Sequence, residues 1–117
     1  MLTSLQRLDV FDNSLSSGQC TMCVLDVLCN CSILKILDLS LNNFNGNLSS
    51  EIGNLSPRLS QLALSRKNIN GKLLGEIGNL TGLLTLGLNN NNFLGEIMNA
   101  LGRLKNLQLL DLSSNEF

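Results

Sequence analysis

The chain has no tryptophan, tyrosine or histidine, and aromatic residues make up only 3% of it. Without histidine, acid–base catalysis by an imidazole is excluded. The shortage of aromatic rings argues against a core built on them. Charged residues are 15% of the chain and the net charge is −1, so the basic footprint that nucleic acids or anionic membranes attract is missing. We therefore expect no nucleic-acid partner.

Long hydrophobic runs are also lacking, and the chain has a single proline. No stretch approaches the roughly 18 apolar residues that suggest a membrane span, so we expect no direct membrane insertion by this segment. The first residues lack the basic start and continuous apolar stretch of a secretory signal. Nothing in the composition requires a cofactor or a metal ion, and we expect neither.

Leucine at a nearly fixed spacing is the dominant feature of the chain. Residues 34–46 read LKILDLSLNNFNG and residues 83–95 read LLTLGLNNNNFLG. The second leucine of this phrase recurs at steps of 29, 25, 24 and 24 residues, at Leu8, Leu37, Leu62, Leu86 and Leu110. A period in the twenties with the pattern L-x-x-L-x-L-x-x-N-x-L is the signature of a leucine-rich repeat solenoid.

The spacing predicts an α/β fold, a right-handed solenoid with a short parallel sheet on the concave side and irregular or 3₁₀ turns on the convex side. One repeat cannot bury its own apolar face, so neighbouring coils must stack into a continuous core. A short helix is expected between residues 19 and 28. The predicted coils are 1–30 with an insertion near 16–28, 31–54, 55–79, 80–103 and an incomplete 104–117.

Each repeat position has a predicted role. Alternation in Leu37-Asp38-Leu39 points both leucines inward. An asparagine follows three residues later, and its amide can hydrogen-bond the backbone of its own coil and of the next one. Lys67 occupies that position in the third coil, where we expect an interruption. The asparagines are Asn13, Asn42, Asn91 and Asn115, and the glycines expected at positive φ are Gly46, Gly71 and Gly95.

Both ends of the chain lie within repeats. Leu2, Leu5 and Leu8 already fit the repeat frame, and Phe117 fills the last apolar position of an unfinished phrase. Polar capping repeats, which such arrays normally need for solubility, are missing. We therefore expect an uncapped slice of a longer array that associates through its ends.

The repeat pattern, extended by Ile52-Gly53-Asn54-Leu55, resembles the plant-specific class of leucine-rich repeat. That class forms ectodomains of plant receptor kinases, receptor-like proteins and polygalacturonase inhibitors. Asn30-Cys31-Ser32 before Leu34 is similar to an opening common in receptor kinases. The long first interval and the extra residue near Pro57 resemble the immune subfamily of Xa-type and bacterial-peptide-sensing kinases. The chain departs from the class where proline is usual, at Ser49, Leu74 and Met98.

The resemblance implies a non-enzymatic recognition module. It also implies that this module is part of the extracellular domain of a plant receptor-like kinase in defence or developmental signalling. Such a module would lie on the extracellular side of the plasma membrane. The implied partners are a peptide or protein ligand and a co-receptor ectodomain. Two alternatives are a secreted inhibitor of a pathogen cell-wall hydrolase, although the cysteine caps of such inhibitors are missing, and a truncated, non-functional receptor fragment.

The predicted binding surface consists of the solvent-facing positions of the strand phrases. Phe11, Ile36 and Leu41 are apolar residues there, and nearby charges make a contact patch plausible. Isolated exposed apolar residues are equally ordinary. Ser40 belongs to the same predicted surface. The residues expected to contact a ligand are Arg7, Asp9, Phe11, Lys35, Ile36, Asp38, Leu41, Gln61, Arg66, Thr85, Asn89, Gln108 and Asp111.

Four cysteines lie close together, but their spacing does not match paired zinc-binding motifs. Cys31 takes an apolar repeat position that suits a buried thiol. Cys20, Cys23 and Cys29 remain candidates for a disulfide, either Cys20–Cys23 or Cys20–Cys29, if the chain is secreted. Unpaired thiols are the alternative.

Four sequons for N-glycosylation favour an extracellular location. The candidate asparagines are Asn30, Asn47, Asn54 and Asn79. Asn30, Asn54 and Asn79 recur at the repeat spacing and therefore share one edge of successive coils. Pro57, directly after the sequon serine, is expected to weaken the Asn54 site.

Overall fold

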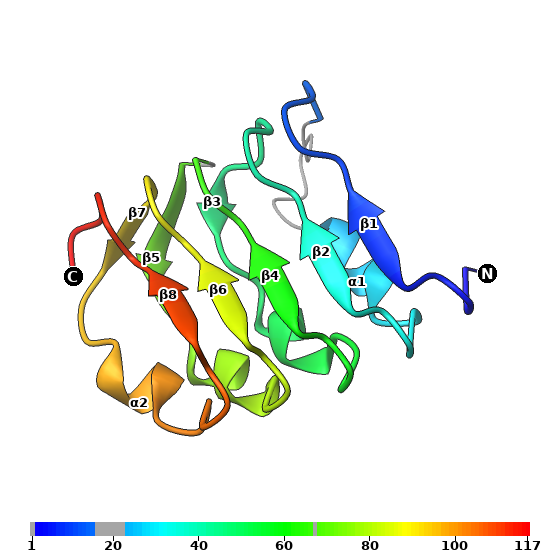
Figure 1. Cartoon of the computed structure of the whole chain (residues 1–117). Helices are drawn as coiled ribbons and strands as arrows, with labels where there is room; N and C mark the ends of the chain where they lie inside the picture. The colour runs from blue at the N-terminus through cyan, green and yellow to red at the C-terminus, as the bar shows by residue number, and fades with distance from the viewer. Residues whose placement is uncertain (1, 16–22, 67) are drawn as a thin grey trace.

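A computed structural model describes residues 2–15, 23–66 and 68–117 as a curved stack of coils (Figure 1). Five three-residue strands form one parallel sheet in the order β1-β2-β4-β6-β8. Their central leucines are paired in register from Leu8 to Leu110. The predicted leucine-rich repeat solenoid is thereby confirmed. The strands are β1 (Arg7–Asp9), β2 (Ile36–Asp38), β4 (Gln61–Ala63), β6 (Thr85–Gly87) and β8 (Leu109–Asp111).

A second parallel sheet lies behind the first in Figure 1 and was not predicted from the sequence. Its strands, in spatial order, are β3 (Gly46–Asn47), β5 (Ile69–Lys72) and β7 (Asn92–Leu94). Gly46, Gly71 and Gly95 have φ between 79° and 88°, which confirms the predicted positive φ. At Gly71 a Cβ would lie only 2.7 Å from the side-chain oxygen of Asn47, so stacking here requires glycine.

Short helical turns cover the convex side. Two are 3₁₀ helices, η1 (Ser50–Asn54) and η2 (Gly75–Asn79), and two are short α-helices, α1 (Cys23–Leu28) and α2 (Met98–Leu101). The predicted 3₁₀ turns are confirmed. Helix α1 lies in the segment expected to be helical, although residues 16–22 are outside the described part. Within the described residues, no helix has the length and apolar character needed to cross a membrane.

The core runs through the middle of the stack. In the coils that begin with β2, β4 and β6, the inward leucine pairs are buried, and so are Phe44, Ile69 and Phe93 behind them. Burial falls toward the ends, where Leu8 is half-buried and Leu110 is 41% exposed. Each coil therefore relies on both neighbours to cover its leucines, as expected of a repeat array.

The asparagine of each repeat ties two coils together. The Asn91 amide nitrogen donates to Leu64 O at 2.8 Å and to Leu88 O at 3.0 Å, and its oxygen accepts the Ile69 N–H at 3.1 Å. Leu64 and Ile69 belong to the preceding coil, so the predicted bond to the next coil is wrong. The Leu64 carbonyl lies just past the end of β4, and the Asn91 amide of the following coil donates to it there.

Asn42 repeats this arrangement one coil pair earlier. Its amide nitrogen donates to Val10 O in the preceding coil and to Leu39 O in its own coil, and its oxygen accepts the Leu15 N–H. The amides therefore supply partners to backbone groups that the sheets do not use. Lys67, where we expect an interruption, lies outside the described residues.

Candidate ligand-binding face

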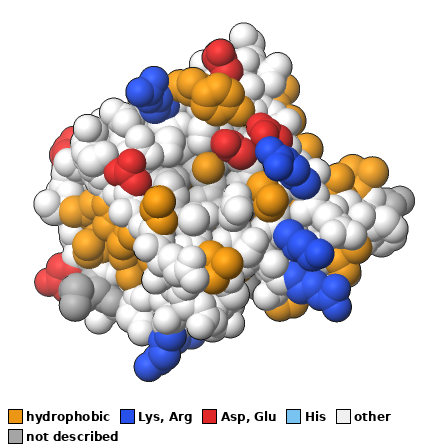
Figure 2. Space-filling view, viewed as in Figure 1, with side chains coloured by type: hydrophobic (Ala, Val, Ile, Leu, Met, Phe, Trp, Pro, Cys, Tyr) orange, Lys and Arg blue, Asp and Glu red, His pale blue; other side chains and the backbone are white. Residues whose placement is uncertain are grey.

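The register of the concave sheet aligns two rows of side chains that are exposed or half-exposed. The strand register aligns one row as Asp9, Asp38, Ala63, Gly87 and Asp111. The second row contains Arg7, Ile36, Gln61, Thr85 and Leu109. The thirteen residues expected to contact a ligand are all exposed or half-exposed. Charges of both signs gather over β1 and β2 in Figure 2, whereas the face over β4 and β6 is mostly uncharged.

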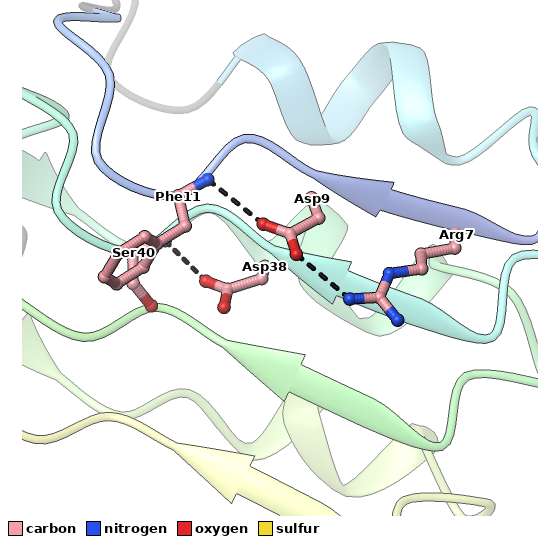
Figure 3. Close-up of polar contacts among 5 residues, drawn as sticks. All are labelled: Arg7, Asp9, Phe11, Asp38 and Ser40. Carbon is pink, nitrogen blue, oxygen red and sulfur yellow. Dashed lines mark hydrogen bonds and ion pairs between the residues drawn. The ribbon is translucent and has the colours of Figure 1, made fainter.

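The Asp9 carboxylate is held on both oxygens (Figure 3). Oδ2 lies 3.1 Å from the Arg7 guanidinium, and Oδ1 accepts the Phe11 N–H at 3.2 Å. The hydrogen bond from Arg7, together with that from the Phe11 N–H, lowers the pKa of Asp9 below its ordinary value. Asp9 therefore stays ionised, and its charge is compensated within its own strand.

Asp38 and Asp111 occupy the same position in later coils. Asp38 Oδ1 accepts the Ser40 N–H at 2.9 Å. Asp111 Oδ1 accepts the Ser113 hydroxyl at 2.6 Å and the Ser113 N–H at 3.0 Å, and these bonds lower the pKa of Asp111. The turn after the strand thus fixes a carboxylate on the concave face in three coils.

A cavity of about 230 Å³ crosses the middle of the concave sheet. Arg7, Asp9 and Ile36 lie at one side of it, and Ala63 and Gly87 form part of its lining. Ala63 and Gly87 stand where three other coils carry aspartate, so short side chains leave this space open. Sequence analysis missed their role, although their small size within the aspartate row was the available signal.

A larger cavity, of about 390 Å³, adjoins the first and shares Asp38 and Ala63 with it. Phe11, Leu41 and Arg66 are among its lining residues. Phe11 is 52% exposed, which makes it an unusual aromatic residue for a solvent-facing position.

A residue with positive φ follows each strand of the concave sheet, at Asp12, Leu41, Arg66, Asn90 and Ser114. Leu41 and Arg66, which line the larger cavity, have φ near +55°, a left-handed conformation that costs a non-glycine residue free energy. Asp12 and Asn90 are residue types that tolerate this conformation better. The left-handed turn is therefore a feature of the repeat.

Most of the predicted contact residues lie around these two cavities, but not all. Lys35, Gln108 and Asp111 line neither of them. The prediction that Ser40 faces solvent is wrong, because its side chain is only 5% exposed. Its hydroxyl oxygen accepts the Ser65 N–H of the next coil at 3.1 Å, which holds it inside the turn.

Cys29 and Cys31 line neither cavity of this face. Cys31 is buried, as predicted, and Cys29 is half-buried with its thiol 3.5 Å from the Glu51 carbonyl oxygen. Burial, with Glu51 nearby, raises the pKa of Cys29 and makes its thiolate scarce. Cys29 and Cys31 are free thiols in the described part of the chain. Cys20 and the side chain of Cys23 lie outside it, so the Cys20–Cys23 disulfide remains a prediction, whereas the free thiol of Cys29 does not support a Cys20–Cys29 disulfide.

Comparison with known proteins supports the leucine-rich repeat assignment. The family model described as "Leucine Rich Repeat" matches residues 33–55 and 82–104. No curated protein matches the chain. The plant peptide hormone receptor RGFR1, solved in complex with RGF2, is 30% identical with a TM-score of 0.83. The similarity covers 97% of this chain and 17% of that receptor, so this chain spans a small part of the receptor's length.

Two further structures show how widely this fold is used. The Arabidopsis receptor kinase HAESA, solved with the peptide hormone IDA and the co-receptor SERK1, is 28% identical with a TM-score of 0.76. Coverage is 97% of this chain and 22% of HAESA. An internalin from Listeria monocytogenes is 29% identical with a TM-score of 0.79, covering 98% of this chain and 30% of the internalin. The match to a bacterial protein means that the fold is not confined to plants.

The fold is that of a leucine-rich repeat solenoid with an exposed concave sheet. Receptor ectodomains and internalins share this architecture with the chain.

Proposed function

We propose that the concave face of this chain binds a peptide or protein ligand within the extracellular domain of a plant receptor-like kinase in defence or developmental signalling. A co-receptor ectodomain is the proposed second partner. Solved receptors with bound peptide hormones, one of them also with a co-receptor, support this over a secreted inhibitor. On this proposal the module lies on the extracellular side of the plasma membrane.

The observation that carries the proposal is the pair of adjoining cavities on the concave sheet. Together they offer about 620 Å³, within the range usual for ligand sites, and they combine exposed apolar residues with fixed charges. Phe11 and Leu41 provide apolar contacts, while Asp38 and Arg66 provide charge. An aromatic anchor with a polar rim is typical of residues that dominate binding energy.

Blocking the concave cavities tests this function. Short peptides are selected from a random library on the chain tethered at low density, and their affinity for two variants is then measured. Ala63→Arg, which fills the cavity floor, is expected to weaken binding by about tenfold or more, because its side chain takes the ligand's space. Asn70→Arg adds the same charge on the other sheet, at an exposed position of β5, and is expected to bind as well as the original chain.

The two variants separate concave binding from binding elsewhere. Equal loss in both would point to a general charge effect. Peptides that ignore Ala63→Arg but fail with Asn70→Arg would place the ligand site behind the concave sheet and contradict the proposal.

Glycosylation of exposed asparagines is a further part of the proposal. Asn30, Asn47 and Asn79 are exposed and are expected to carry glycans after secretory expression. Asn54 is exposed as well, but Pro57 follows its sequon, and the Ser56 hydroxyl is buried and donates to Ser32 O at 2.9 Å. We expect Asn54 to stay unmodified. Mass spectrometry of peptides after enzymatic deglycosylation checks each site, and a glycan at Asn54 with none at Asn79 would contradict this assignment.

A further inference from the structure

Asp38 is the uncompensated carboxylate at the junction of the two cavities. The ion pair within residues 2–15, 23–66 and 68–117 joins Arg7 to Asp9, one strand away. The Asp38 carboxylate accepts a hydrogen bond from the Ser40 N–H of its own coil. Figure 3 shows both carboxylates, with the guanidinium engaged by Asp9 alone. The larger cavity therefore has a negative charge, on Asp38, that forms no ion pair within the described residues.

Phe11 adds a second feature that suits a cation. Its ring is about half exposed and lines the same cavity as Asp38 and Leu41. The face of an aromatic ring attracts a positive charge, and lysine and arginine have aliphatic stems that pack on apolar surfaces. One wall of the cavity thus matches the stem of a basic side chain, and Asp38 matches its charged head.

Arg66 places a positive charge on one side of the larger cavity. It lies on the coil of β4, two coils from Phe11, and also lines the cavity. No hydrogen bond or ion pair engages its guanidinium within the described residues, so it repels a cation that approaches from the side of β4. A basic group is therefore favoured near Asp38, on the side of β1 and β2.

We propose that the larger cavity binds a lysine or arginine side chain of a peptide ligand, with its stem against Phe11 and Leu41 and its charged head on Asp38. This inference rests on the proposed function and names the ligand chemistry that the concave face selects. Asp111, in the same register position, serves as a natural comparison because the coil before it has Asn89 where the coil before Asp38 has Phe11.

Peptide selection with matched variants tests the inference. Short random peptides selected on the tethered chain are expected to be several-fold enriched in lysine and arginine over the starting library. Asp38→Asn keeps an oxygen for the Ser40 N–H but removes the charge, and is expected to weaken the selected peptides by about tenfold. Asp111→Asn removes the same charge in the fifth coil, three coils beyond Asp38, and is expected to leave binding unchanged.

Two more variants test the roles of the Phe11 ring and of the Arg66 charge. Phe11→Leu keeps an apolar side chain but loses the ring, so binding is expected to fall by roughly threefold. Arg66→Gln removes the repulsion and is expected to tighten binding of basic peptides. If the ligand group were a carboxylate, Arg66→Gln would weaken binding instead.

The outcomes separate this inference from the proposed function. Suppose that Ala63→Arg weakens binding, but the selected peptides are not enriched in lysine and arginine or bind the Asp38→Asn variant as well as the original chain. This result would overturn the site for a basic side chain and would still support ligand binding on the concave face. Failure to select any peptide, or peptides that ignore Ala63→Arg, overturns both.

Discussion

Replacing Asn91 with alanine is expected to lower the free energy of unfolding by about 3 kcal/mol. The Asn91 side chain is only 7% exposed and serves two carbonyls and one N–H. Alanine leaves these backbone groups buried without the amide, at about 1–3 kcal/mol for each unsatisfied group, partly offset by relaxation and water. The urea midpoint should fall by roughly 1 M or more. Because the chain has no tryptophan or tyrosine, far-UV circular dichroism in dilute solution is the measurement.

The other repeat asparagines provide a graded control. Asn115 is half-buried and makes equivalent bonds to Leu88 O and the Phe93 N–H. Asn115→Ala is therefore expected to lower the free energy of unfolding by less than Asn91→Ala does. Asn13 is exposed and bonds to Val10 O and Phe11 O within its own coil. Asn13→Ala is expected to cost less than about 1 kcal/mol. Equal losses at all three positions would show that contact between coils does not set the cost.

The isolated chain is expected to self-associate as its concentration rises. Strands β1 and β8 are the open edges of the concave sheet, and the faces beside them carry exposed apolar side chains. Leu2 and Val27 are each 66% exposed on one face, while Leu110 and Phe117 are about 40% exposed on the other. Open strand edges beside uncovered leucines are templates for pairing. Light scattering should give a mass above the 12.7 kDa of one chain.

A lysine substitution at one end face tests the cause of this association. Val27→Lys is expected to shift the chain toward the monomer, because the charge must otherwise be buried between copies. Leu84→Lys introduces the same residue at a 37%-exposed position on the concave face and is expected to change little. A monomer at every concentration, or association reduced only by Leu84→Lys, would contradict association through the end faces.

The concave sheet and the core could be predicted from the sequence, because leucine spacing directly reports which side chains point inward. The buried pairs around Leu37, Leu62 and Leu86 follow from that frame. The second sheet could not be predicted, because its short strands, such as Gly46–Asn47, have no apolar alternation. Their pairing appears only when coils stack. The direction of the Asn91 bonds was missed for the same reason.

The candidate site was predictable only as a surface. Alternation identified which strand residues face solvent, including Phe11 and Asp38. Cavities depend on differences in size between neighbours, such as Ala63 and Gly87 beside the aspartates, and no single repeat contains that information. Ser40 was misplaced because its burial arises from a bond to the next coil, at Ser65.

The most direct test of concave recognition is a crystal structure of the chain with a selected peptide. The peptide is expected to lie across β1, β2, β4 and β6, to cover Ala63 and Gly87, and to place a basic side chain beside Asp38. A peptide bound over β3, β5 and β7 or over the convex helices, with the concave cavities empty, would contradict the account.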